Sequence, residues 1–284
     1  MTARGSALAA VALVLAAGCS SGGAGNPTVP AIAPAKVYTL GGFQPAGVVH
    51  ADRPVTLGFT VVQPSGEPLV RYRTGPGPHT GVHLIIVRDD LSRIIHLHPP
   101  VSPSGSVTQR IVLPKPGPYR VLVDVYPAHH GPGYVNFQLY RTIHVAGRYQ
   151  PTPLPRFQPH VTVHGYRFTL QHVPKLRVAQ AALMTVTVTD SSNRPARFTP
   201  WYGALAHAIF FHKGDLAYFH THVCSPGLAG CASIVAGTPV SGSSTKPGVL
   251  RVGVLVPEAG TWRLFLQCKV DGHILTAPYT LHVR

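Results

Sequence analysis

The sequence predicts an all-β protein of two tandem antiparallel β-sandwich domains that arose by internal duplication. Three observations predict this class: short runs of Val, Ile, Thr, Phe and Tyr, many turn residues between them, and a motif that occurs twice. The chain of 284 residues contains 29 Gly and 29 Pro, which disfavours long helices and favours strands joined by turns. With 45% hydrophobic residues, it is expected to bury the cores of about two domains of roughly 100–150 residues each.

The repeated motif has the pattern His-x12-His-x-His. It runs from His83 to His98 and returns from His207 to His222. The flanking segments agree as well, because Gly, an aromatic residue and Arg follow each copy, as in Gly117-Pro-Tyr-Arg and Gly260-Thr-Trp-Arg. We therefore predict two homologous domains, 37–147 and 158–284, with a stiff Pro-rich linker at 148–157.

Each predicted domain is about 110 residues long and contains several short strands at regular spacing. No amphipathic helix of about 12 residues or more is evident in either one. This length and pattern are typical of an immunoglobulin-like sandwich.

The N-terminus has the pattern of an export signal. Arg4 precedes an apolar run that is too short to span a membrane, and residues 1–19 end in Leu-Ala-Ala-Gly-Cys, which resembles a bacterial lipobox with Cys19 as the lipidated residue. Residues 20–36 are then a flexible tether. The alternative is an ordinary signal peptide cut elsewhere. Either way, we expect export, and the lipobox predicts a palmitate-bearing lipoprotein anchored at the extracytoplasmic face of the cell membrane.

Export places the remaining cysteines in an oxidising environment, where disulfides form and persist. Cys224 and Cys231 enclose a turn-rich loop, so we predict a local disulfide between them. Cys268 lies in a strand-like run and is either a buried free thiol or a soft metal ligand.

The histidine spacing predicts a metal site in each domain. A two-residue turn at Asp89-Asp90 would place His83 opposite His96 in a hairpin, and His98 would share their face. A turn at Lys213-Gly214 would do the same in the second copy. A slip of one residue would move a histidine off the shared face. The candidate metal ligands are His83, His96, His98, His207, His220 and His222.

Three neutral imidazoles on one face can bind copper or zinc. The alternative is an inherited structural cluster in which the histidines cap a sandwich core through hydrogen bonds to carbonyl groups. His79, four residues before His83, is a further candidate ligand.

The second copy also resembles a known group of proteins. Gly203-Ala-Leu-Ala-His, then Asp215-Leu, then His220-Thr-His is similar to exported bacterial proteins with YtkA-like or copper-resistance-type immunoglobulin-like domains. The resemblance implies a β-sandwich and a role in handling copper or another heavy metal. The first copy departs from the pattern before His83, and the chain has only two methionines, which favours Cu(II) or Zn(II) over Cu(I).

The residue inventory does not favour an enzyme. The nine acidic residues form no evident pair for glycoside hydrolysis, and there is no Gly-x-Ser-x-Gly or phosphate-loop motif. The formal charge is +15, but Lys and Arg are scattered singly, so we expect no nucleic-acid partner. The expected partners are the membrane through the lipid anchor, and an anionic envelope surface or another envelope protein.

Two function classes remain. One is a lipid-anchored metal-binding protein with one three-histidine site per domain. The other is a metal-free adhesion or scaffold protein of the cell envelope.

Overall fold

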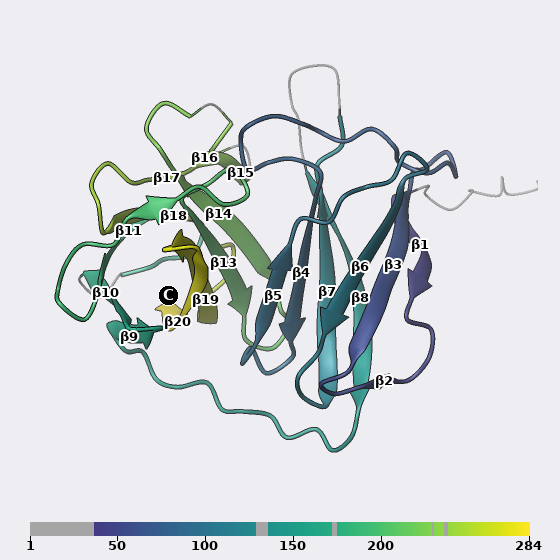
Figure 1. The fold of residues 1–284 in the computed structure, drawn as a ribbon, viewed down its shortest axis with the longest axis horizontal. Helices are drawn as coiled ribbons and strands as arrows, with labels where there is room; N and C mark the ends of the chain where they lie inside the picture. Colours follow the sequence, from purple (N-terminus) through teal and green to yellow (C-terminus); the bar gives the residue numbers. More distant parts are fainter. Residues whose placement is uncertain (1–36, 129–135, 172–174, 229, 236–237) are drawn as a thin grey trace, which may run out of the picture. The chain divides into compact units, whose positions relative to one another are not determined.

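The computed structural model describes residues 37–128, 136–171, 175–228, 230–235 and 238–284 (Figure 1). The predicted signal peptide at 1–19, the lipidation of Cys19 and the tether at 20–36 lie outside the described residues. Within the described ranges, the regular secondary structure consists of β-strands alone. The same part of the chain contains no helix that is long and apolar enough to cross a membrane.

The first half of the chain forms a three-stranded and a five-stranded sheet. Its strands are β1 (Thr39–Gln44), β2 (Val49–His50), β3 (Pro54–Val62), β4 (Val82–Arg88), β5 (Ile94–Leu97), β6 (Ser106–Val112), β7 (Gly117–Val125) and β8 (Phe137–Ala146). The sheet orders are β1-β3-β6 and β2-β8-β7-β4-β5. From β3 onward, the chain changes sheets between β3 and β4, between β5 and β6 and between β6 and β7, which is the arrangement of an immunoglobulin-like sandwich.

The second half repeats this plan with additions. Its strands are β9 (His160–Val163), β10 (Tyr166–Gln171), β11 (Ala182–Thr189), β12 (Phe198–Thr199), β13 (Ala206–His212), β14 (Tyr218–Cys224), β15 (Ser233–Val235), β16 (Thr238–Val240), β17 (Gly242–Ser243), β18 (Val249–Val254), β19 (Gly260–Val270) and β20 (His273–Val283). The short strand β17 pairs with both β14 and β18. It therefore joins the two layers of this sandwich into one continuous sheet.

The strand pairings of the two halves correspond. β3 pairs with β6 as β11 pairs with β18, β4 pairs with β5 and β7 as β13 pairs with β14 and β19, and β7 pairs with β8 as β19 pairs with β20. The first half has its own apolar core, and so does the second. The predicted class of two tandem immunoglobulin-like sandwiches is confirmed.

The predicted register of both histidine hairpins is wrong. His96 lies opposite Ile85, not His83, and His207 lies opposite His222, not His220. The reason is the turn: Arg88 N donates to Arg93 O, and His212 N donates to Ala217 O, so each hairpin closes over a four-residue loop, not a two-residue turn. The shift is two residues, and side chains alternate with a period of two, so the histidines keep their shared face.

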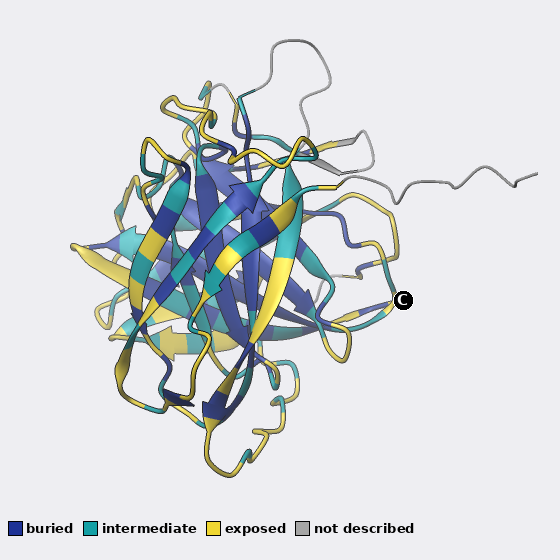
Figure 2. Ribbon diagram, turned by 90° about the vertical axis from the view of Figure 1, so that its right-hand side faces the viewer, coloured by how far each residue is buried: buried dark blue, intermediate teal, exposed yellow. Residues whose placement is uncertain are grey.

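The histidine face of each half lies outside that half's own apolar core and packs against the histidine face of the other half. All seven residues of β4 are buried because its two faces enter different cores. Leu84 and Ile86 belong to the first sandwich core, whereas Ile85 and Val87 pack against residues of β13 and β19. We call this third cluster the junction core; it comprises Ile85, Val87, Leu91, Leu122, Ile209, Phe211, Leu216 and Phe265. Figure 2 shows the strands through the middle of the described unit in dark blue, the colour of buried residues.

Polar contacts fasten the linker and the loops around the junction core. The backbone N–H of Thr152, in the linker, donates to Asp90 Oδ2 at 2.7 Å, and the guanidinium of Arg88 pairs with the same buried carboxylate. From the other hairpin, Asp215 O accepts a 2.7 Å hydrogen bond from Arg120 Nη1. The linker is thus held against the first half rather than lying free between two separate domains, consistent with the compact unit Lys36–Arg284.

Gly203 lies where a loop of the second half touches a loop of the first. Its φ is +75°, and an added Cβ would lie 2.6 Å from the carbonyl carbon of Gly77 and 2.8 Å from the nitrogen of Pro78. We expect Gly203→Ala to lower the free energy of unfolding by about 2–4 kcal/mol, because left-handed strain and a backbone clash add together. Gly165→Ala is the matched control, with φ +79° and nothing within 4 Å, and we expect it to cost about 1–2 kcal/mol. Urea unfolding that gives both variants the same loss would contradict this contact between the halves.

Candidate metal centre

The six predicted histidines meet in one cluster at the junction. His83 and His96 lie on β4 and β5, His98 follows β5, His207 lies on β13, and His220 and His222 lie on β14. The ring centroids of His96 and His207 are 4.9 Å apart, and those of His83 and His220 are 5.5 Å apart. The predicted triplet of the second half, His207, His220 and His222, comes together as expected. In the first half, His83 and His96 converge with His220 of the second half rather than with His98, because the two histidine-bearing faces pack against each other.

Ligand nitrogens converge in two groups within this cluster. His83, His96 and His220 form the first group, and His207, His220 and His222 form the second; within each group the candidate ligand atoms lie within 4.8 Å of one another. The first group takes ligands from both halves. His98 is not one of its members, but its Nε2 lies 3.1 Å from Nε2 of His96.

Three rings have one nitrogen held by a protein acceptor, which leaves the other nitrogen as a lone-pair donor. Nε2 of His83 donates to Pro78 O at 2.8 Å, and Nε2 of His207 donates to Trp201 O at 2.9 Å. Nδ1 of His96 donates to Oε1 of Gln267 at 3.1 Å. An outer acceptor of this kind fixes the ring and its tautomer in metal-ligating histidines.

The orientation of the Gln267 amide is itself fixed, because its Nε2 donates to Oγ1 of Thr276 at 3.0 Å. Gln267 lies directly opposite His207 on the neighbouring strand. At the equivalent position of the first half, Asp124 lies opposite His83. Both polar residues interrupt apolar strands at the same place in the repeat, and that signal was available in the sequence although the prediction did not use it.

Several buried imidazole nitrogens have no hydrogen-bond partner. They are Nδ1 of His83, Nδ1 of His220, and both ring nitrogens of His222. Leaving a buried polar atom unpaired costs about 1–3 kcal/mol. A metal ion that accepts the lone pairs of His83, His220 and His222 would remove most of that cost, with only the N–H of His222 left unpaired, whereas an inherited structural cluster would bear all of it.

Burial keeps the cluster uncharged at neutral pH. Desolvation lowers the pKa of His79 and of His207 to about 4. It also lowers the pKa of His83, His96, His98, His220 and His222, where the neighbouring imidazoles disfavour protonation further. The neutral imidazole is the form that binds metal, so the ligands need not lose protons at pH 7.

The distances between donors fit a metal ion. Two nitrogens bound tetrahedrally at about 2.0–2.1 Å lie roughly 3.3 Å apart. The Nε2 atoms of His96 and His98 are 3.1 Å apart, and Nδ1 of His207 is 3.4 Å from Nε2 of His220. The candidate ligand atoms of each group all lie within 4.8 Å of one another.

Two aromatic side chains of the second half pack against the cluster. The ring of Tyr202 stacks on that of His98, at 3.9 Å between centroids and 5° between planes. Trp201 packs edge-on against His96 and His207, at 5.4 and 5.0 Å. The sequence prediction did not include either residue.

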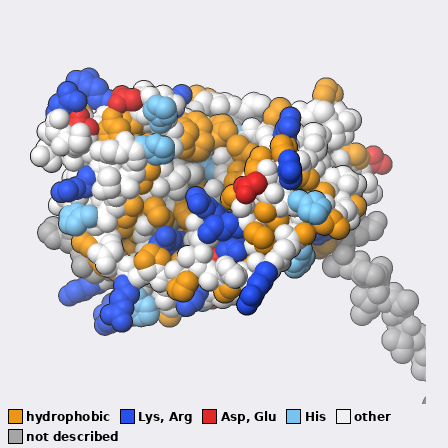
Figure 3. All heavy atoms as spheres, turned by 60° about the horizontal axis from the view of Figure 1, so that its bottom comes forward, with side chains coloured by type: hydrophobic (Ala, Val, Ile, Leu, Met, Phe, Trp, Pro, Cys, Tyr) orange, Lys and Arg blue, Asp and Glu red, His pale blue; other side chains and the backbone are white. Residues whose placement is uncertain are grey.

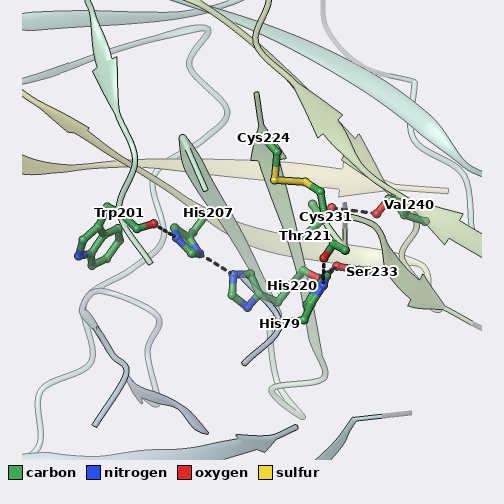
Figure 4. Close-up of a disulfide and its surroundings, with 10 residues drawn as sticks. His79, Trp201, His207, His220, Thr221, Cys224, Cys231, Ser233 and Val240 are labelled. Atoms are coloured by element: carbon green, nitrogen blue, oxygen red, sulfur yellow. Dashed lines mark hydrogen bonds between the residues drawn. A yellow bond between two sulfur atoms is a disulfide. The ribbon is translucent and has the colours of Figure 1, made fainter. Parts of the chain in front are cut away.

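The loop closed by the disulfide lies beside His79 and His220 (Figure 4). Cys224 and Cys231 are joined, as the sequence predicts. Beside them, Oγ of Ser233 donates to His220 O at 2.9 Å, and His79 contacts Gly230 O through Nδ1 at 2.7 Å and the Ser233 hydroxyl through Nε2 at 3.3 Å. Both nitrogens of His79 thus have partners, so it borders the cluster as a supporting residue.

Sulfur donors of the described chain lie elsewhere. Cys268 is a free thiol buried in the core of the second sandwich, where desolvation raises its pKa to about 12, and Met184 belongs to the same core. The cluster is therefore a nitrogen-donor site, and the alternative of Cys268 as a soft ligand does not fit its position.

Comparisons with known proteins give little information about function. A family model described as Domain of unknown function (DUF8832) matches residues 161–284, less than half of the chain. Comparison with curated proteins finds no match. Among solved structures, invasin, a bacterial integrin-binding protein, is similar at 14% identity and TM-score 0.23 over 87% of this chain.

Two further structures show similarity of the same kind. Fibronectin(III)-like modules of Clostridium thermocellum CbhA match at 10% identity and TM-score 0.22, over 87% of this chain and 93% of theirs. Salmonella alpha-2-macroglobulin matches at 15% identity and TM-score 0.27, over 89% of this chain. The chain spans 38% of the invasin chain and 15% of the alpha-2-macroglobulin chain, and matches this weak carry no argument about what the protein binds.

Proposed function

We propose that the protein binds Cu(II) or Zn(II) at the histidine cluster between its two sandwich halves. The observation that carries this proposal is the convergence of buried imidazole nitrogens in the two three-histidine groups, in which His83, His220 and His222 each have at least one ring nitrogen without a hydrogen-bond partner. An all-imidazole site without thiolate or thioether donors favours Cu(II) and Zn(II) over Cu(I). The role is binding or buffering of the metal, without a catalytic step.

The proposed location follows from the sequence. The lipobox-like segment ending at Cys19 supports a lipid anchor at the extracytoplasmic face of the cell membrane. On the face seen in Figure 3, Lys and Arg side chains are scattered widely and outnumber the acidic ones. This distribution, with the formal charge of +15, supports attraction to an anionic envelope surface rather than to a nucleic-acid groove.

Titration of the purified protein with Cu(II) and with Zn(II), measured by isothermal calorimetry, tests the proposal. We expect His220→Ala to weaken binding at least ~100-fold, because His220 belongs to both groups and loss of even an outer-shell partner commonly costs 10–100-fold. For Cu(II), quenching of fluorescence gives a second readout, since Trp201 packs on two of the histidines.

The control variant is His212→Ala, which alters the surface group of His212, Asp215 and Glu258. It should bind as the wild type does. If metal binding depended on His212 and not on His220, the metal site would be the surface group. The junction cluster would then be part of a metal-free scaffold.

A further inference from the structure

The number of free donors exceeds what one metal ion needs. The two groups share a single member, His220, and together contain five different histidines. A tetrahedral ion takes four ligands. His220 is the one histidine that belongs to both groups.

The two nitrogens of His220 have different surroundings. Its Nε2 lies 3.4 Å from Nδ1 of His207, which assigns it to the second group. Its Nδ1 is buried and has no hydrogen-bond partner, and its ring lies 5.3 and 5.5 Å from the rings of His96 and His83, the other members of the first group. Three other rings, those of His83, His96 and His207, have a carbonyl or amide oxygen at one nitrogen. Among the described residues, the only acceptor of His220 is Nδ1 of His207, itself a ligand of the second group. A metal ion bound there would replace this hydrogen bond, so both nitrogens of His220 can become ligands.

Resting on the proposed metal-binding function, we propose that the junction holds two divalent metal ions bridged by the imidazole ring of His220. One ion is bound by His83, His96 and one nitrogen of His220, and the other by His207, His222 and the second nitrogen of His220. The first ion joins the two halves of the chain, whereas the second lies within the second half.

Bridging requires one proton to leave. A neutral imidazole carries one N–H, so when the second ion binds, that N–H bond breaks and its electron pair forms the second nitrogen–metal bond. The proton passes to solvent. The resulting imidazolate carries one negative charge between two cations, and neither metal changes its oxidation state.

A buried carboxyl group lies on the strand next to His83. Asp124, the cross-strand neighbour of His83, is buried and accepts four hydrogen bonds, from Asn136 Nδ2 at 2.6 Å, Gln138 Nε2 at 2.8 Å, Tyr126 OH at 3.1 Å and Tyr218 OH at 3.3 Å. Desolvation raises the pKa of the Asp124 carboxyl, and these four donors act in the opposite direction. The Tyr218 donor comes from β14, the strand that carries His220, so this network also spans the junction.

Titration of the protein with Cu(II) separates the proposal from the proposed function. Bound copper is counted after removal of free metal, and unpaired spins are counted by electron paramagnetic resonance. We expect two equivalents of tightly bound copper, a full spin signal after the first equivalent, and a signal that falls as the second binds, because an imidazolate bridge couples the two spins. One proton should be released on bridge formation.

Single-sided variants keep the test valid if His220→Ala fails to fold. His96→Ala and His222→Ala each remove a ligand from one group only, and each should bind one equivalent fewer, with every bound copper visible. His220→Ala should abolish coupling whatever copper it retains. One tight equivalent in the wild type, or two equivalents with all spins visible, would overturn the bridge while leaving the metal site standing; no bound copper would overturn the proposed function itself.

Discussion

Saturating Zn(II) is expected to raise the melting temperature of the protein by about 10 °C and to leave that of His220→Ala almost unchanged. A ligand that binds only the folded state stabilises it by about 4 kcal/mol at a free concentration of 1,000 times its Kd. For a folded unit of this size, each kcal/mol shifts the melting temperature by roughly 2–4 °C. The first metal group is built from both halves, so the ion should also stabilise their packing.

The comparison is made within each variant, with and without zinc, because removal of a buried side chain also changes the stability of the metal-free protein. His212→Ala is the control, and its zinc-induced shift should equal that of the wild type. The melting temperatures are measured by scanning calorimetry. If zinc raised the melting temperature of His220→Ala as much as that of the wild type, zinc would act somewhere other than the junction.

Acid is expected to unfold the metal-free protein over an unusually high pH range. The pKa of His79 and of His207 is about 4 in the folded protein, against about 6.5 in an unfolded chain. The unfolded state therefore binds more protons between these values, and stability falls as the pH decreases through that window. Each of the two groups costs about 2 kcal/mol by pH 5 and about 3 kcal/mol by pH 4. The other cluster histidines have lowered pKa values and act in the same direction.

Urea unfolding at pH 7, 6 and 5 in the presence of a chelator measures this dependence. The double variant His79→Gln, His207→Gln should show a shallower decline, by roughly 2–3 kcal/mol per pH unit in the lower part of the window. Equal slopes in the variant and the wild type would mean that these two rings are protonated in the folded state as easily as in the unfolded one.

The sequence predicts much of this fold because local signals and the duplication agree. The repeat is visible in the equal spacing of His83 to His98 and His207 to His222, and the corresponding strands of the two halves pair alike. The shared histidine face survives a wrong register because the slip is an even number of residues. The four-residue loops were not evident, because Leu91 and Leu216 adopt φ of 57° and 60°, a conformation that leucine rarely takes.

The meeting of the histidines of both halves in one cluster could not be predicted from hairpin geometry alone. It depends on which surface covers the face of Ile85 and Val87, and this contact is between residues far apart in the chain. A sequence signal does exist: β4 is apolar at nearly every position of both faces, which is typical of a strand buried on both sides. A second signal is the polar residue at the same place in both apolar repeats, Asp124 and Gln267.

The most direct test is the position of the metal itself. Crystals grown with Zn(II) and measured at the zinc absorption edge should show anomalous peaks within about 2.0–2.1 Å of nitrogens from His96 and His220, one from each half of the chain. A peak confined to the surface residues His212, Asp215 and Glu258, or no peak in the presence of saturating zinc, would contradict the account of a metal centre at the junction.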